Sequence, residues 1–186
     1  MVCHGNFSLN PSVRRTWYNP EVILNDLGLK PGMVFVDVGC ADGFFSLLAA
    51  KIVKETGRVY SIDIDTKAIE KLKRKAAKMG LNNIDFIVGK GEDVVVCEHC
   101  ADFVFYSMAL HDFNDVCKVL QNAKQMLKPK GVLADLDWKK KQMDFWPPLN
   151  IRFSEEYVSN LIKQTGLNII TVKAVGEHHY LVTAKP

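Results

Sequence analysis

The loop after the first apolar run combines carboxylates with glycines. It reads VDVGCADG over residues 36–43. Gly39 and Gly43 permit a tight turn and a close approach of a ligand to the backbone, and the helix that follows directly offers free N–H groups. Asp63 ends the next apolar run about 20 residues after Gly43, where an acidic residue can hold both hydroxyls of a ribose. The pattern therefore indicates a nucleotide-type cofactor.

The charge of this loop distinguishes a cofactor that contains a pyrophosphate from one that is cationic. A pyrophosphate would face Asp37 and Asp42, and the loop contains no Lys or Arg to neutralise it. A cationic ligand gains from the same carboxylates. S-adenosylmethionine (SAM) carries a sulfonium, an α-ammonium and a ribose, so Asp37 suits its amino-acid end and Asp63 its ribose. The loop thus favours SAM and disfavours an NAD-dependent oxidoreductase.

Strand-like and helix-like segments alternate along the chain and must position these loops. We expect strands at 33–38, 58–64, 84–88, 102–107, 132–138, 168–174 and 178–183, with helices at 44–54, 66–79, 114–127 and from Ser154 to Gly166. The alternation predicts an α/β fold with a mostly parallel, doubly wound sheet and helices on both faces. Only about four residues separate the last two strands, enough for a hairpin but not for a crossover helix, so the last strand should run antiparallel. Ligands bind such sheets beyond the carboxyl ends of the strands.

Four motifs resemble those of the class I SAM-dependent methyltransferases, at residues 36–43, 59–64, 88–93 and 102–111. The likeness runs from about Glu21 to the C-terminus. The Asp-Trp-Lys run at 137–139 and the two prolines at 147–148 are similar to small type 11 members related to the ubiquinone/menaquinone-biosynthesis enzymes. The resemblance implies SAM as cofactor and a Rossmann-like, seven-stranded sheet of order 3-2-1-4-5-7-6 with strand 7 antiparallel.

The resemblance also implies which residues hold the cofactor. Asp37, Gly39 and Gly43 would frame the methionine part, Asp63 would hold the ribose, and Gly91 with Glu92 would lie beside adenine. The remaining cofactor-binding residues implied are Cys40, Ala41, Ile64 and Ser107. The chain departs from the family pattern twice: Ala41 replaces the middle glycine of the first motif, and Lys90 replaces a common acidic or amide contact to adenine.

Methyl transfer needs mainly the alignment of its reactants, so a catalytic residue is not obligatory. Where the acceptor must lose a proton, His111, just beyond the fourth strand, is the candidate base, although it also suits a helix cap or a loop hydrogen bond. Asp112 and Asp115 are assigned to capping. Asp137 and Trp138 follow the fifth strand and are candidate substrate contacts.

Residues 139–153 form the predicted substrate loop. Phe145 and Trp146 within it favour a small, apolar or aromatic acceptor. We expect deletion of Phe145 and Trp146 to weaken acceptor turnover and to leave SAM affinity nearly unchanged.

Other functions remain open on the sequence alone. A SAM-binding protein with a regulatory or no catalytic role would share the cofactor motifs. Cys97 and Cys100 form a CxxC without a second ligand pair, so no metal site is expected, but arsenite-methylating relatives use cysteines. The lysines at 139–141, beside Trp138, are the one feature that suits an RNA substrate.

The length and composition limit the number of domains and the classes of partner that we expect. The chain has 186 residues, 48% hydrophobic and 24% charged, which predicts one domain over residues 1–186 with residues 1–20 as an N-terminal extension. The net charge of +3 is too small to indicate nucleic acid. We expect a cytoplasmic protein, since we find neither a signal peptide nor about 20 consecutive apolar residues, and reduced thiols, since the five cysteines lack disulfide spacing. The oligomeric state does not follow from these features.

Overall fold

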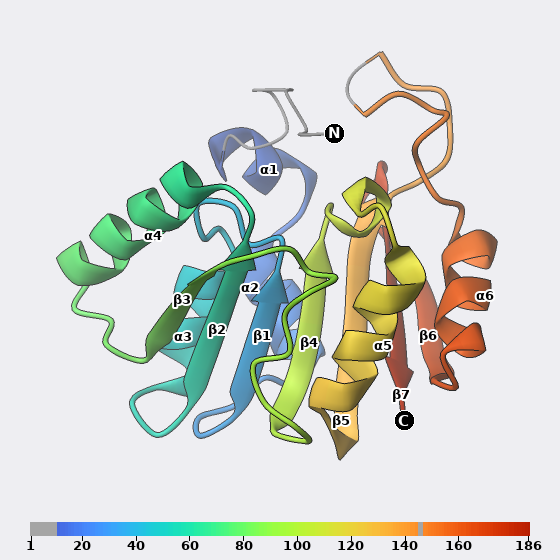
Figure 1. Ribbon diagram of the computed structural model, residues 1–186. Coiled ribbons are helices and arrows are strands. Elements are labelled where there is room, and N and C mark those ends of the chain that lie inside the picture. The colour runs from blue at the N-terminus through green and yellow to red at the C-terminus, as the bar shows by residue number, and fades with distance from the viewer. Residues whose placement is uncertain (1–10, 145–146) are drawn as a thin grey trace.

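The fold is built on one seven-stranded sheet, seen in a computed structural model that describes residues 11–144 and 147–186 (Figure 1). The strand order is β3-β2-β1-β4-β5-β7-β6. The strands are β1 (Val34–Val38), β2 (Arg58–Asp63), β3 (Ile84–Val88), β4 (Ala101–Ser107), β5 (Leu127–Trp138), β6 (Asn168–Val175) and β7 (His179–Lys185). Strands β1 to β5 pair in parallel, whereas β7 runs antiparallel to both β5 and β6. The predicted fold class, strand order and C-terminal hairpin are confirmed.

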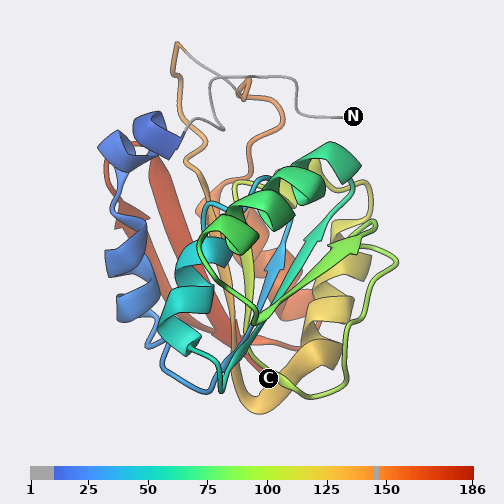
Figure 2. The ribbon, with the colours of Figure 1, turned by 90° about the vertical axis from the view of Figure 1, so that its left-hand side faces the viewer.

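Helices cover both faces of the sheet (Figure 2). They are α1 (Pro11–Trp17), α2 (Pro20–Asp26), α3 (Ser46–Val53), α4 (Thr66–Lys78), a short 3-10 helix η1 (Leu110–Asp112), α5 (Val116–Met126) and α6 (Glu155–Gln164). Residues of α2, α3 and α4 pack on one face around Phe35 and Phe105, while α5 and α6 pack on the other face around Val104 and Val182. This arrangement leaves the carboxyl ends of β1, β2, β3, β4 and β5 free to carry a site.

Polar side chains fix where several helices begin. Asn19, Asp65, Asp115 and Ser154 each accept a hydrogen bond from a backbone N–H of the first turn of α2, α4, α5 and α6. The capping role expected of Asp115 is therefore confirmed.

Two segments differ from the sequence-based expectation. Residues 11–26, for which no helix was expected, contain α1 and α2. Strand β5 begins at Leu127, five residues earlier than expected, because Leu127 already pairs with Ala101 before a register shift. Pro129 favours this change, since the residue before a proline is pushed out of helical geometry into the extended region.

The cysteines at 97 and 100 also differ from expectation. The structure joins Cys97 and Cys100 in a disulfide with their Cα atoms 5.9 Å apart, whereas we had expected reduced thiols. Cys40 and Cys117 are free.

No helix among the described residues is both long and apolar enough to cross a membrane.

Candidate active site

A cavity of about 260 Å³ opens at the carboxyl ends of the parallel strands. The loops after β1, β2, β3, β4 and β5 all contribute to its wall, and α1 adds Arg14. Its lining includes these residues singled out from the sequence: Gly39, Ala41, Asp63, Ile64, Gly91, Glu92, Ser107, His111 and Trp138. The cavity therefore lies where the alternation of strands and helices placed a ligand site.

The glycines of the first loop are required by geometry. Gly39 has φ +77°, and a Cβ atom there would lie 2.6 Å from the Cβ of Ala109. Gly43 has φ +86°, and its Cβ would collide with Leu72. Ala41 also takes a left-handed conformation, with φ 47°, which costs an L-residue roughly 1–2 kcal/mol. The loop thus keeps the tight turn although its middle residue is alanine.

Asp63 ties the first loop to the end of β2. Its Oδ2 accepts a hydrogen bond from the N–H of Ala41 at 2.7 Å, and its Oδ1 accepts one from the N–H of Asp65 at 2.8 Å. Burial raises the pKa of the carboxyl, while these backbone hydrogen bonds act in the opposite direction. The carboxylate is held rigidly on the cavity wall with lone pairs left over for ligand hydroxyls.

Asp37 lies below this loop, inside the protein. Its Oδ2 accepts a hydrogen bond from the Ser46 hydroxyl at 2.5 Å, and its Oδ1 is buried without a partner among the described residues. Burial raises the pKa of Asp37 to about 6, against a lowering by Ser46 and then by Arg14. A buried carboxylate oxygen without a partner can accept a hydrogen bond from a cationic group of a ligand.

Among the predicted site residues that the structure describes, four do not line the cavity: Asp37, Cys40, Gly43 and Asp137. Cys40 is instead buried in a small cluster with Ile69 and Leu72, and burial raises the pKa of its thiol well above the usual range. Cys40 and Gly43 therefore determine how the loop packs against Leu72 and do not form part of the cavity wall.

Asp42 requires a correction to the charge argument. We took Asp42 as an unneutralised carboxylate facing the ligand, but Lys71 and Lys75 of α4 pair with it at 2.7 and 2.8 Å. Asp42 therefore faces α4. The acidic character of the cavity comes from other residues: four carboxylates, of Asp63, Asp65, Glu92 and Asp112, line it against the two cations of Arg14 and Lys90.

The loop after β3 forms a second wall together with an aromatic ring. Gly91 lies against Phe113, whose ring would be 2.8 Å from a Cβ at that position. The side-chain amide of Asn122 donates hydrogen bonds to the carbonyls of Gly91 and Glu92 at 3.0 and 2.8 Å. Phe113 and Gly91 thus offer a flat, apolar surface at the end of the cavity bordered by Ile64 and Lys90.

His111 and Asp137 form a buried pair. The Nδ1 atom of His111 lies 2.8 Å from Oδ2 of Asp137, and both side chains are 1% exposed. The other Asp137 oxygen accepts the N–H of Trp138 at 2.7 Å. Asp137, predicted to touch substrate, therefore lies behind His111, and His111 lines the cavity. A carboxylate in this position fixes the tautomer and orientation of an imidazole.

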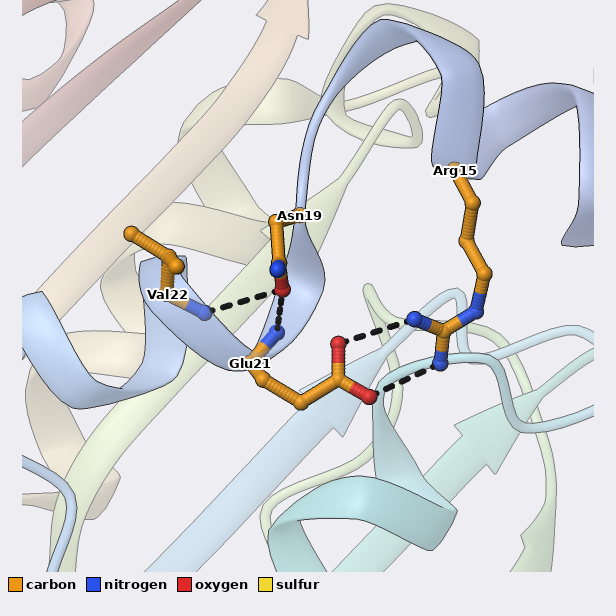
Figure 3. Close-up of polar contacts among 4 residues, drawn as sticks. All are labelled: Arg15, Asn19, Glu21 and Val22. Atoms are coloured by element: carbon orange, nitrogen blue, oxygen red, sulfur yellow. Dashed lines mark hydrogen bonds and ion pairs between the residues drawn. The ribbon is translucent and has the colours of Figure 1, made fainter.

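Arg14 is a cavity residue that the sequence analysis missed. Its guanidinium is buried, donates a hydrogen bond to the Ser107 hydroxyl at 2.7 Å and one to the Tyr18 hydroxyl at 3.0 Å, and lies 4.1 Å from the centre of the Phe44 ring. The neighbouring Arg15 also lies over the Phe44 ring, at 5.7 Å, but it is exposed and pairs with Glu21 at 2.9 Å beside the Asn19 cap of α2 (Figure 3). Two adjacent arginines of α1 thus have opposite environments.

Trp138 forms the wall on the β5 side. Its ring packs against His179 at 4.2 Å and against Trp17 at 5.0 Å between ring centres. Arg152 lies 5.8 Å from this ring and donates hydrogen bonds to the carbonyls of Lys141 and Pro147, so it joins the two limbs of the predicted substrate loop. Pro147 reaches the cavity. Phe145 and Trp146 lie outside the described residues.

The CxxC lies away from this cavity. Cys100 directly precedes Ala101, the first residue of β4, whereas the cavity lies at the other end of that strand. Seven extended residues span roughly 20 Å. Within residues 11–144 and 147–186, no three His, Cys, Asp or Glu side chains are grouped so that they could hold a metal ion.

Comparison with known proteins identifies the family. Residues 29–171 match a family model described as a methyltransferase domain, which is more than half of the chain. The chain belongs to the SAM-dependent methyltransferases. A SAM-dependent methyltransferase from Aquifex aeolicus is similar in structure, with a TM-score of 0.86 and 30% identity over 95% of this chain and 98% of that one. Geranyl diphosphate C-methyltransferase from Streptomyces coelicolor, solved with S-adenosylhomocysteine, shares the methyltransferase fold at 12% identity and a TM-score of 0.76, over 89% of this chain and 74% of that one.

Two curated methyltransferases are similar to part of the chain. The demethylmenaquinone methyltransferase of Staphylococcus aureus is 28% identical over 62% of this chain and 47% of its own length. The ubiquinone/menaquinone biosynthesis C-methyltransferase of Haemophilus ducreyi is 28% identical over 75% of this chain and 53% of its own length. The chain thus spans about half the length of the curated relatives it matches.

The described residues of this methyltransferase fit SAM. Asp37 offers a buried acceptor oxygen without a partner among the described residues, Asp63 offers a fixed carboxylate, and Gly39 and Gly43 allow the tight turn where a Cβ would collide with Ala109 or Leu72. SAM as cofactor, predicted from the charge of the loop and from the resemblance, is confirmed by the family.

Proposed function

We propose that this protein methylates a small aromatic acceptor, with His111 as the general base. The observation that carries the proposal is the His111–Asp137 pair, in which His111 lines the cavity together with Trp138 and Asp137 lies behind it. When bound, SAM supplies an electrophilic methyl group. The chain itself supplies the cradle for the cofactor, an apolar wall for the acceptor and a site for the proton that the acceptor loses.

Two charges suit the amino-acid end of the cofactor. Asp37 provides an anion and Arg14 a cation, and the two lie close enough for Arg14 to lower the pKa of Asp37. A zwitterionic amino acid needs this combination, since its ammonium and carboxylate are adjacent. We assign Asp37 to the α-ammonium and Arg14 to the α-carboxylate.

Other residues hold the remaining parts of the cofactor. Asp63 accepts from the ribose hydroxyls, because its rigid carboxylate lines the cavity at the end of β2. Ile64, Gly91 and Phe113 provide apolar contact to adenine, and Glu92 borders it while also accepting the N–H of Asn114 at 3.0 Å.

The role of Asp37 predicts a pH-dependent affinity. Below pH 6 the Asp37 carboxyl of the free enzyme takes up a proton, and binding of an ammonium group requires that proton to leave. The dissociation constant of SAM should therefore rise by up to about tenfold per pH unit as the pH falls below about 6. Calorimetric titration between pH 5 and 8 measures this. Asp37→Asn should bind weakly at every pH and lose the dependence; a parallel dependence in this variant would refute the assignment.

The two arginines of α1 provide a matched pair of variants. Arg14→Met removes one charge-assisted hydrogen bond to the cofactor carboxylate, worth about 1.5–3 kcal/mol, and should weaken S-adenosylhomocysteine binding about 10- to 100-fold. Arg15→Met removes the exposed pair with Glu21 and a 5.7 Å contact with the Phe44 ring, and since Arg15 does not line the cavity it should change the affinity less than twofold. Thermal melts first establish that both variants fold. Calorimetry then compares their dissociation constants for S-adenosylhomocysteine. Equal affinities would exclude a contact with the cofactor.

The acceptor side combines apolar residues with His111 and with the Asp112 carboxylate, whose Oδ1 lies 3.6 Å from Nε2 of His111. Met108, Trp138 and Pro147 line it, and Phe145 with Trp146 belong to the same loop in sequence. The curated relatives are named for quinone biosynthesis, which suggests a hydroxylated ring as acceptor. The Nε2 atom of His111 would take the hydroxyl proton, and Asp137 would stabilise the resulting imidazolium. A phenolate formed in this way is a nucleophile at its oxygen and at its ring carbons.

The position of the CxxC argues against thiol-dependent methylation of arsenite. Cys97 and Cys100 lie at the start of β4, about a strand length from the cavity, and so cannot present a metalloid to it. The lysines at 139–141 do not line the cavity, and Lys139 donates to the carbonyls of Gly176 and Glu177. This arrangement weakens the RNA alternative.

The proposal is tested by titration followed by turnover. Calorimetry should show binding of SAM and none of NAD. Incubation with methyl-labelled SAM and a set of hydroxylated aromatic compounds should then give labelled product that requires His111. Binding of SAM without turnover of any compound would favour the SAM-binding protein without catalysis, and binding of NAD alone would overturn the cofactor.

A further inference from the structure

A second buried carboxyl group, Asp135, lies behind the His111–Asp137 pair. It precedes Asp137 by two residues on β5, so both side chains project from the same face of the sheet. Asp135 is 0% exposed, and neither of its oxygens has a hydrogen bond of ordinary geometry with a described residue, although the Tyr180 hydroxyl lies close enough to act on the Asp135 pKa as a hydrogen-bond donor. Asp137, by contrast, has a partner for each oxygen. The two carboxyl groups on this strand thus differ in their hydrogen bonding.

The groups around Asp135 do not include a cation paired with it. Tyr106 lies beside it on β4, and its hydroxyl donates to the carbonyl of Val119 in α5. Tyr180 of β7 lies close enough for it and Asp135 to affect each other's pKa. Among the described residues, no Lys or Arg forms an ion pair with Asp135. More remote charges act on its neighbours: Glu155 of α6 on Tyr180, and Arg152 on Asp137.

A charged carboxylate in such surroundings is energetically unfavourable. Removing it from water without a partner costs several kcal/mol, and proteins avoid this cost by keeping the proton. Burial accordingly raises the pKa of Asp135 well above its usual range and the charge of Asp137 raises it further, whereas His111 and the Tyr180 hydroxyl act in the opposite direction. Burial, the lack of a paired Lys or Arg among the described residues and a neighbouring carboxylate all favour the protonated form.

We propose that Asp135 is a positioning residue, held as a neutral carboxylic acid so that Asp137 is the one fully buried negative charge beside His111 among the described residues. The other carboxylate near His111, that of Asp112, is partly exposed and lies 3.6 Å from Nε2. This inference rests on the proposed function of His111 as a base. One carboxylate orients the imidazole and stabilises its charged form. A second buried negative charge would keep His111 protonated at neutral pH, and a histidine that is already protonated cannot accept the proton of the acceptor.

Infrared spectroscopy tests the protonation directly and needs no turnover. In the complex with S-adenosylhomocysteine at pH 8, where Asp37 is ionised, wild-type protein should show the C=O stretch of a protonated carboxyl group. Labelling aspartate with carbon-13 should shift this band, and Asp135→Asn should remove it. Asp102→Asn is the matched control, since Asp102 pairs with Lys128 at 2.7 Å and its loss should leave the band in place. Absence of the band in labelled wild type would overturn the inference.

Unfolding measurements provide a second test. The folded protein would keep a proton on Asp135 that the unfolded chain releases above about pH 4, so wild type should lose stability relative to Asp135→Asn as the pH rises. Between pH 5 and 8 the ratio of their folding constants should change about tenfold per pH unit. Parallel stability curves would contradict a neutral Asp135, whatever the enzyme does.

The pH profile of turnover then links Asp135 to His111. In Asp135→Asn the acid limb of the kcat profile should stay at its wild-type pH, because asparagine copies the neutral acid. In Asp137→Asn the acid limb should move to lower pH, because a charge is removed. A shift of one pH unit in Asp135→Asn would mean that Asp135 is charged and would overturn the inference. If the infrared band is present but His111 variants keep full activity, the proposed base fails and the protonation of Asp135 stands.

Discussion

His111→Gln should lower kcat about 10²- to 10⁴-fold, the range that a positioned general base contributes. Glutamine keeps a hydrogen-bonding group toward Asp137 but cannot take up a proton. The affinity for SAM should stay within about threefold, because the base acts on the acceptor. Steady-state rates between pH 6 and 9, with calorimetry for the cofactor, measure both quantities, and the acid limb of the kcat profile should disappear.

His99→Asn is the control for this experiment. His99 has φ +49°, which asparagine tolerates, and its Nδ1 contacts the carbonyl of Leu127 outside the cavity. This variant should keep the wild-type rate. If His111→Gln does the same at every pH, alignment of the reactants alone accounts for the rate and the base assignment is lost.

Asp63→Ala should weaken SAM binding about 10²- to 10³-fold. The loss has two parts: each charge-assisted hydrogen bond to a ribose hydroxyl contributes about 1.5–3 kcal/mol, and the N–H groups of Ala41 and Asp65 lose their acceptor. Calorimetric titration with SAM and S-adenosylhomocysteine should show the same factor for both, since they share the ribose.

Asp42→Ala separates this effect from a general loss of charge in the region. Asp42 belongs to the first loop but pairs with Lys71 and Lys75, so its removal should change the affinity less than threefold. A similar loss in both variants would mean that loop order, rather than a contact from Asp63, governs binding.

Local patterns explain why most of the fold is predictable from the sequence. The strands of the parallel sheet are short apolar runs that alternate with amphipathic helices, and the periodicity of each segment is visible within about a dozen residues. The hairpin of β6 and β7 follows from the length of its loop alone. Helix α2 was missed although Asn19 and Pro20 are a standard start signal, because its seven residues are too few to show a period.

The site was harder to predict because its contacts join distant parts of the chain. His111 and Asp137 were each singled out, but their pairing across 26 residues depends on β4 and β5 being neighbours. Arg14 contacts Ser107 across 93 residues, and nothing near Arg14 in sequence distinguishes it from Arg15. The pairing of Asp42 with α4 likewise requires knowing which face of that helix turns toward the first loop.

The antiparallel direction of β7 bears on how such proteins diverge. Because β7 starts at the edge where the parallel strands end, His179 packs against Trp138 on the side of the cavity that we propose for the acceptor. The contacts that we propose for ribose and adenine come instead from the loops after β2, β3 and β4. On this proposal, substitutions in the turn before His179 can alter the wall at Trp138 and leave the ribose and adenine contacts unchanged. Descendants of one ancestral cofactor site can thus differ in the part of the acceptor wall that lies near the C-terminus.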